Sequence, residues 1–220
     1  MAASLHQDRS RYHPQVGFPI GRRWPTWQRD YRYGTLVIMP PPNLASVLDP
    51  IRERLDPVSA ATIGAHITLT PPFAAAPSDA DVERVRTACR GVASMRLRLE
   101  RPTHFSGSSV LYLPVLPTEA FLNLREVLLA TGLFRLDLPH TTDFVPHLTL
   151  SEFGAAPEVD GRDIPPLEAM AFLADAVAWV VPDEALHFTV RRTFMLGASG
   201  RLSPARSTPT ATSRGRPRRR

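Results

Sequence analysis

The sequence predicts a domain of alternating strands and helices in which one unit is nearly repeated. Hydrophobic residues make up 43% of the 220 residues, enough to bury a real core. Strand-type and helix-type patterns follow one another along the chain. The phrase His-x-Thr-Leu begins at His66 and again at His147, although composition alone would give two copies only about 0.002 times. These three observations indicate a folded domain with a duplicated strand.

The first half of the chain is divided by prolines and by helix-capping residues. The elements expected there are a strand at 35–39, a helix capped by Asn43 that runs to Leu55, a strand at the first copy, a helix opened by Ser78 that runs to Val92, and a strand at 95–99.

The second half begins after a turn at Gly107 and repeats much of this order. The elements expected there are a strand at 110–115, a helix at 117–129 that ends near Gly132, a strand at the second copy, a helix from Pro166 to Asp175, and strands at 176–181 and 186–196. The two copies of the phrase therefore take equivalent places in the order.

Each copy alternates as a half-buried strand does, so its histidine and threonine face one way and its two apolar residues face the other. The apolar residues expected in the core are Ile67, Leu69, Leu148 and Leu150. The opposite face presents His66 with Thr68 in one copy and His147 with Thr149 in the other. An imidazole beside a hydroxyl suits the binding of a phosphate.

The doubled phrase and its flanks resemble the 2H phosphoesterase family, which includes the bacterial 2′-5′ RNA ligases and the RNA 2′,3′-cyclic phosphodiesterases. Thr70-Pro71-Pro72-Phe73 follows the first copy, Pro146 precedes the second, and Ser151-Glu152-Phe153 follows it. The resemblance extends from Tyr33 to Gly197. It implies an α+β fold of two pseudo-symmetric lobes, each an antiparallel sheet backed by helices, with a central cleft.

Opening a phosphodiester without a metal needs one group to take a proton, one to give a proton, and donors for the phosphate oxygens. Two imidazoles fill the first two roles near neutral pH, and the hydroxyls of Thr68 and Thr149 fill the third. By resemblance, His66 is the proton donor and His147 the proton acceptor toward water. The reaction implied opens a 2′,3′-cyclic phosphate to the 2′-phosphate, and its reverse is a 2′-5′ ligation.

Other histidines and one phenylalanine have open alternatives. His187 begins a third His-x-Thr but lacks the leucine and the flanks, so we expect it to lie outside the site. His104 and His140 are expected on the surface. Phe105 matches a family phenylalanine near the cleft, and contact with a base and packing in the core both remain open for it.

The ligand patterns of metal sites are missing, so neither a metal nor another cofactor is expected: there is no His-x-x-x-His, no His-x-His and no cysteine pair. An enzyme is the favoured class. The alternative is a non-catalytic nucleotide-binding module that uses the same cleft. The presence of both imidazoles and both hydroxyls favours the enzyme.

The positive charge lies mainly at the two ends of the chain. Residues 1–33 hold six Arg and two acids, a net +4, and are expected to form a partly ordered N-terminal arm; residues 199–220 hold seven Arg and no acid and are expected to be a disordered tail. The domain between them, residues 34–198, has 13 Arg and 19 acids, a net −6. A broad basic groove for duplex RNA is therefore not expected, and RNA 3′ ends or small cyclic nucleotides are the expected partners.

The lone cysteine and the absence of long apolar runs bear on the compartment. Cys89 has no partner for an internal disulfide, which favours a reducing interior. The longest apolar stretch, Ala169 to Val181, is interrupted by Asp175 and is too short to span a bilayer. We expect a cytoplasmic protein that does not bind membranes, and a monomer.

Overall fold

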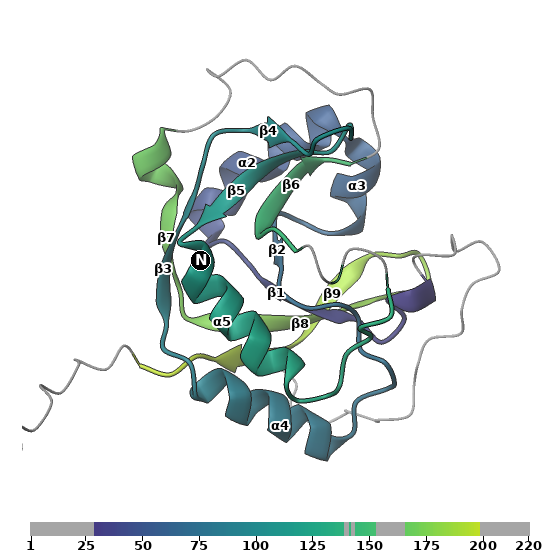
Figure 1. The fold of residues 1–220 in the computed structure, drawn as a ribbon. Helices are drawn as coiled ribbons and strands as arrows, with labels where there is room; N and C mark the ends of the chain where they lie inside the picture. The colour runs from purple at the N-terminus through teal and green to yellow at the C-terminus, as the bar shows by residue number, and fades with distance from the viewer. Residues whose placement is uncertain (1–28, 139–140, 142–143, 153–165, 199–220) are drawn as a thin grey trace, which may run out of the picture.

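Two antiparallel sheets form the centre of the protein (Figure 1). The computed structural model describes residues 29–138, 141, 144–152 and 166–198. The first sheet has the strand order β2-β1-β8-β9. Its strands are β1 (Thr35–Ile38), β2 (Ile67–Thr68), β8 (Ala176–Pro182) and β9 (Phe188–Met195).

The second sheet is organised around β5. The strands β3 and β4 pair with successive parts of one side of β5, β6 pairs with its other side, and β7 pairs with β3. Its strands are β3 (Met95–Leu99), β4 (Thr103–His104), β5 (Leu111–Leu116), β6 (His147–Ser151) and β7 (Ala171–Ala174).

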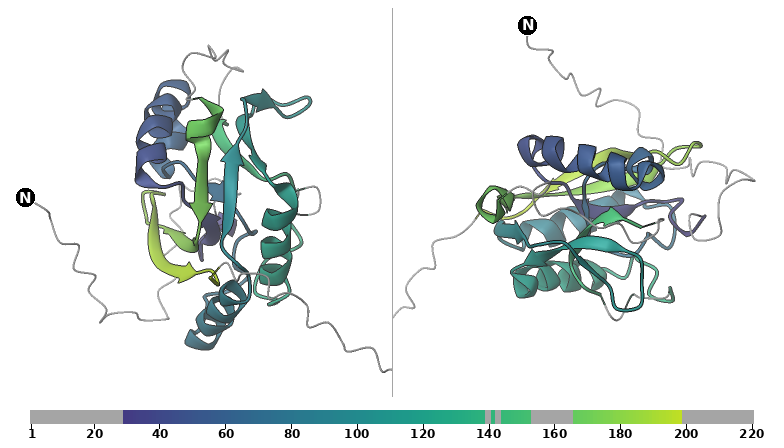
Figure 2. Two further views of the ribbon diagram at one scale, coloured as in Figure 1. Left: turned by 90° about the vertical axis from the view of Figure 1, so that its left-hand side faces the viewer. Right: turned by 90° about the horizontal axis from the view of Figure 1, so that it is seen from above.

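Helices flank the sheets, with α2 and α5 on opposite sides of the strands in the two further views (Figure 2). The helices are α2 (Pro42–Leu55), α3 (Pro57–Thr62), α4 (Asp79–Arg90), α5 (Thr118–Leu129) and the short 3-10 helix η2 (Leu167–Met170). Ser78 and Asp81 form a capping box at the start of α4, as the sequence predicts. Within the described residues, no helix has both the length and the apolar character needed to cross a bilayer.

One unit occurs twice: a strand, a helix and then an edge strand that carries the His-x-Thr phrase. In the first sheet the unit is β1–α2–β2, with α3 inserted, and in the second it is β5–α5–β6. The two edge strands, β2 and β6, contact each other across the boundary between the sheets. The predicted α+β fold with two pseudo-symmetric antiparallel sheets is therefore confirmed.

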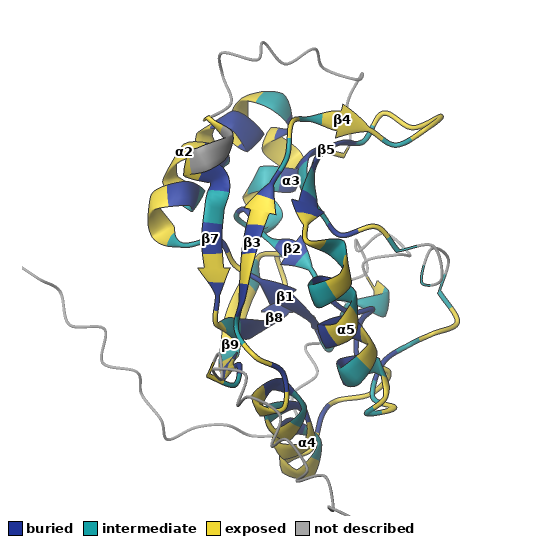
Figure 3. Cartoon of the chain, turned by 60° about the vertical axis from the view of Figure 1, so that its left-hand side comes forward, coloured by how far each residue is buried: buried dark blue, intermediate teal, exposed yellow. Residues whose placement is uncertain are grey.

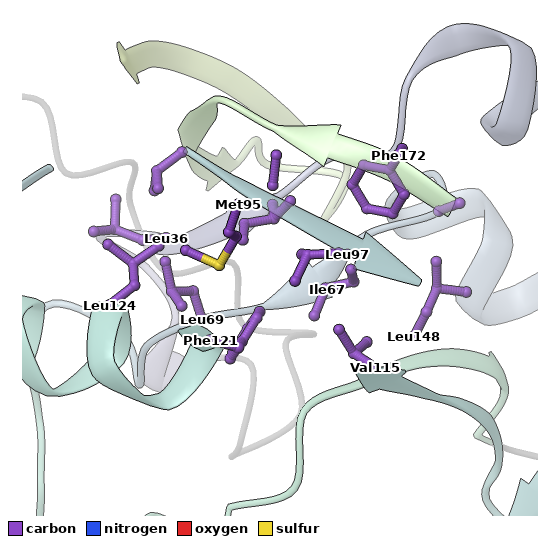
Figure 4. Packing of buried hydrophobic residues seen from close by; sticks show 14 of the residues in the cluster. Leu36, Ile67, Leu69, Met95, Leu97, Val115, Phe121, Leu124, Leu148 and Phe172 are labelled. Atoms are coloured by element: carbon purple, nitrogen blue, oxygen red, sulfur yellow. The ribbon is translucent and has the colours of Figure 1, made fainter. Parts of the chain in front are cut away.

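The apolar residues of both phrases enter one core. Ile67, Leu69 and Leu148 have no exposed surface, and Leu150 is 1% exposed. Figure 4 shows Ile67, Leu69 and Leu148 in the same cluster as Leu97 of β3. The strands β1 and β8 are almost entirely buried (Figure 3). The two motif strands are thus fixed from behind by a common core, as the alternation predicts.

The helix predicted from Pro166 to Asp175 is wrong. The chain forms only the single turn η2 and then β7, which pairs with β3 through four residues from Ala171 to Ala174. The alanine-rich composition favours a helix, but strand pairing overrides that local preference, with Phe172 turned into the core. Short elements were also missed: α3 and β4 have no counterpart in the prediction.

Other boundaries agree closely, with one difference in capping. The helix α2 begins after Pro41, whose side chain makes no capping bond, and Pro42 takes the first turn, so Asn43 is not the cap. Cys89 lies buried in α4, and burial raises the pKa of its thiol to about 12. The expected tail at 199–220, residues 1–28 of the expected arm and His140 lie outside the described residues.

Candidate functional site

The site is built on the two edge strands that meet between the sheets. His66 lies just before β2 and His147 begins β6. Thr68 pairs with Val37 of β1, and Thr149 pairs with Tyr112 of β5. All four histidine and threonine side chains are partly buried, whereas the apolar residues between them are fully buried. The expected division of each phrase into a core face and an open face is confirmed.

Both imidazole rings are held by the same local hydrogen bond. Nδ1 of His66 lies 2.8 Å from the carbonyl oxygen of Gly64, and Nδ1 of His147 lies 2.7 Å from that of Val145. A carbonyl oxygen only accepts, so Nδ1 carries the proton in each ring. In the neutral form Nε2 is then the atom with the free lone pair. Each phrase therefore presents Nε2 as the reactive nitrogen.

The two rings differ in their electrostatic surroundings. Burial lowers the pKa of His66 to about 4; the nearby charge of Arg52 adds to this, as does that of His147, while the bond to Gly64 opposes it. Burial also lowers the pKa of His147, again against the hydrogen bond to its carbonyl partner. Both rings are therefore mainly neutral at pH 7 in the unliganded protein.

Aromatic rings surround His147 but have no counterpart in what the structure describes around His66. Phe105 stacks on Tyr112 with ring centroids 4.0 Å apart. The His147 ring meets Phe105 edge-on at 5.1 Å and Tyr112 at 5.3 Å. Phe105 is partly buried, whereas Tyr112 is 9% exposed. The structure thus brings Phe105 to the second motif, where the Phe105 ring is the more accessible of the two aromatic rings beside His147.

Three charged residues, on α2 and at its C-terminal end, lie beneath both motifs. Asp49 and Arg52 are three residues apart on one face of α2, and Asp56 follows at the junction of α2 and α3, where it caps α3. Arg52 is 1% exposed and its Nε donates to the carbonyl oxygen of Thr149 at 3.0 Å. Asp49 accepts from the backbone N–H of Ala65 at 2.6 Å. Asp49 therefore contacts the main chain next to His66, and Arg52 contacts the main chain within β6.

The remaining histidines lie elsewhere. His187 is exposed beside the turn between β8 and β9, with Nδ1 3.6 Å from a carboxylate oxygen of Asp183. His104 is exposed on β4, in agreement with the prediction. In the part of the chain that the structure describes, no three His, Cys, Asp or Glu side chains gather as metal ligands would.

Sequence reasoning missed Tyr112 and Arg52. Tyr112 is identified only once the pairing of β5 with β6 is known, because a strand residue directly opposite Thr149 shares its face of the sheet. Arg52 gives a weaker signal: it follows the apolar residues Leu48 and Ile51 on α2, at the edge of the stripe that faces the core. Nothing in the local pattern indicates that it would reach β6, 97 residues away.

Comparison with known proteins places the chain in a family. The model of the 2′-5′ RNA ligase superfamily matches residues 40–197. No curated protein matches the sequence. Among solved structures, E. coli LigT complexed with NADP+ is 18% identical with a TM-score of 0.52, and the match covers 74% of this chain and 96% of that one.

Two further solved structures have the same fold. E. coli LigT complexed with 3′-AMP is 19% identical with a TM-score of 0.52, covering 74% of this chain and 96% of that one. The protein TT0787 of Thermus thermophilus is 20% identical with a TM-score of 0.52, covering 76% of this chain and 98% of that one.

Two antiparallel sheets whose edge strands both carry His-x-Thr define an α+β protein with a duplicated motif strand. The family match covers more than half of the chain and includes both strands. The chain belongs to the 2′-5′ RNA ligase superfamily, the 2H phosphoesterases.

Proposed function

We propose that this protein is a metal-independent phosphodiesterase that opens 2′,3′-cyclic phosphates of RNA 3′ ends or small nucleotides to the 2′-phosphate. The observation that carries the proposal is the matched pair of imidazoles. His66 lies just before β2 and His147 begins β6, two edge strands that contact each other, and each histidine directs its proton-bearing Nδ1 at a carbonyl oxygen so that Nε2 serves the reaction. General acid and base catalysis requires two such groups.

In the proposed reaction, His147 takes a proton from water through Nε2 while the water oxygen attacks phosphorus. The bond from phosphorus to O3′ breaks, and His66 gives its proton to O3′. The hydroxyls of Thr68 and Thr149 donate to the non-bridging oxygens as negative charge builds there. A 5′-hydroxyl in place of water would form a 2′-5′ linkage by the same steps. Phe105, beside His147, is the proposed contact for the nucleobase.

The proton donor must be charged before it acts. Because burial and Arg52 hold the pKa of His66 near 4 in the unliganded protein, the negative phosphodiester has to supply the compensating charge. Substrate binding and protonation of His66 are then linked: each favours the other. This linkage restricts the acidic form of His66 to the bound state.

The proposal includes an organisation of the whole chain. The catalytic domain would span residues 34–198, with an arm before it and an Arg-rich tail after it, in a cytoplasmic monomer. Deleting residues 199–220 is then expected to leave turnover of a cyclic mononucleotide unchanged and to weaken binding of longer RNA at low salt. Collapse of the mononucleotide rate would mean that the tail contributes to the site.

The test is hydrolysis of 2′,3′-cyclic AMP by the purified protein with EDTA present. The proposal expects turnover that EDTA does not reduce. Loss of turnover in EDTA would contradict the metal-independent mechanism. Binding of the nucleotide without turnover would contradict the proposed enzyme activity and support the alternative, a non-catalytic nucleotide-binding module.

A further inference from the structure

The guanidinium of Arg52 joins the two motifs through main chain. Its Nε donates to the carbonyl oxygen of Thr149 at 3.0 Å, and its Nη1 donates to that of Ile63 at 2.7 Å. Thr149 belongs to the second phrase, and Ile63 precedes the glycine whose carbonyl oxygen holds His66. One buried side chain therefore contacts both halves of the site.

Two carboxylates, one on α2 and one at the junction of α2 and α3, extend this connection. Asp49 accepts from the N–H of Ala65, next to His66, and lies 3.6 Å from the Arg52 guanidinium. Asp56 accepts from the N–H of Ser59 at 2.9 Å and from the N–H of Glu152, just after β6, at 2.8 Å. Helix α2 and the capping residue that follows it thus set the spacing between the residues leading into the first motif and the end of the second.

We propose that Arg52 is a positioning residue: it fixes the distance between His66 and Thr149 by holding, from one helix, the main chain that leads into the first motif and the main chain of the second. The proposal rests on the proposed function, because it assigns Arg52 a part in that reaction. Arginine suits the task, since its planar group directs several N–H donors at fixed angles, whereas lysine is a point charge on a flexible stem. The groups that act electrostatically on Arg52 are Asp49, Asp56 and Glu152.

Arg52 also acts on His66 by charge. Its positive charge and that of His147 both lower the pKa of His66, after the larger effect of burial. Arg52→Gln removes the charge and should therefore raise the pKa of His66. Arg52→Lys keeps the charge but loses the planar guanidinium, so it should leave that pKa unchanged. Geometry and charge become separable with two variants.

Arg125 supplies a matched control. It is also buried, at 4% exposure, and it donates to the carbonyl oxygens of Leu69, at 2.6 Å, and Thr141, at 3.1 Å. It therefore holds the last residue of the first motif in a comparable way, but its guanidinium packs over Phe144 and makes no bond to the second motif in the part of the chain that the structure describes.

The experiment compares Arg52→Lys, Arg52→Gln and Arg125→Gln by kcat/KM for 2′,3′-cyclic AMP and by NMR titration of the His66 ring in the free protein. We expect kcat/KM to fall about 10-fold to 100-fold in both Arg52 variants. The His66 titration should move to higher pH in Arg52→Gln alone. Arg125→Gln should lose thermal stability comparably without moving that titration.

Several outcomes would overturn the proposal. Arg52→Lys with wild-type kcat/KM would show that the guanidinium geometry is not needed, and this variant carries the test if Arg52→Gln does not fold. The proposal would also fail if Arg52→Gln and Arg125→Gln lost kcat/KM equally and neither moved the His66 titration. Arg52 would then contribute only to the stability of the fold. If the wild-type protein turns over no cyclic phosphate, the proposed function fails. In that case the positioning role is tested separately by the affinity for inorganic phosphate and the pKa of His66 in Arg52→Gln. Wild-type values of both would contradict the positioning role.

Discussion

His66 and His147 make the same hydrogen bond from equivalent places in the two sheets. In each ring Nδ1 donates to the carbonyl oxygen of the residue two positions earlier, at 2.8 Å and 2.7 Å. Because this carbonyl belongs to the segment leading into the motif, the local chain path fixes the ring as well as the strand. Each phrase thus carries the reactive group, and the residues that lead into it orient that group.

Replacing either histidine with alanine is expected to lower kcat/KM for a 2′,3′-cyclic nucleotide by about 100-fold or more, because each supplies one of the two proton transfers. His66→Ala and His147→Ala are measured beside His187→Ala. His187 is exposed and lies beside Asp183, away from the motif strands, so its replacement should leave the rate unchanged. An equal loss in His187→Ala would mean that the wrong His-x-Thr copies have been paired.

The pKa of His66 should be measurable as about 4 in the free protein, where burial and then Arg52 lower it. Addition of inorganic phosphate should raise this pKa, because a bound anion favours the charged ring. Two-dimensional NMR of the histidine ring signals against pH checks both statements. Titration of His66 near 6.5, the ordinary value for histidine, would contradict the electrostatic account of the site.

The same lowered pKa predicts how stability depends on pH. In the unfolded chain His66 titrates near 6.5, so between about pH 6.5 and pH 4 the unfolded state binds more protons than the folded state. The contribution of neutral His66 is therefore present above this window and is lost as pH falls through it. The free energy of unfolding measured in urea should fall more between pH 7 and pH 4 for the wild type than for His66→Gln. Parallel pH dependences of the two proteins would refute the claim.

Adjacent residues of β6 should separate activity from stability. Thr149→Val removes the proposed donor to phosphate, so we expect kcat/KM to fall about 10-fold to 100-fold with unfolding free energy changed by less than about 1 kcal/mol. Leu148→Ala empties a fully buried position and should cost about 2–5 kcal/mol. Paired activity assays and urea titrations check this, and a stability loss in Thr149→Val equal to that of Leu148→Ala would refute it.

Phe105 should affect binding more than chemistry. Its ring stacks on Tyr112 and borders His147, so Phe105→Leu is expected to raise KM for a cyclic nucleotide several-fold, with kcat changed little. Steady-state kinetics on 2′,3′-cyclic AMP provide both constants. A fall in kcat with unchanged KM would mean that Phe105 orients His147 instead of contacting the base.

The parts of the fold that sequence could predict are those with local signals. The strand at Met95–Leu99 and the helix at Thr118–Leu129 appear at the expected positions because hydrophobic periodicity and the proline before the helix are local features of the sequence. The helix expected before Asp175 fails because β7 forms through pairing with β3, a partner about 75 residues away in sequence.

The same distinction holds for the site. The doubled phrase is visible in the sequence, and its faces follow from strand alternation. By contrast, Arg52 reaches Thr149 only because α2 packs against β6, and Tyr112 meets His147 only because β5 pairs with β6. These contacts depend on tertiary arrangement, so no spacing rule in one sequence reveals them.

The most direct test of the proposed function is the product formed from 2′,3′-cyclic AMP in EDTA, identified by ³¹P NMR for the wild type and for His147→Ala. The account predicts adenosine 2′-phosphate from the wild type and a rate at least about 100-fold lower in the variant. A 3′-phosphate product, or an undiminished rate in His147→Ala, would contradict it.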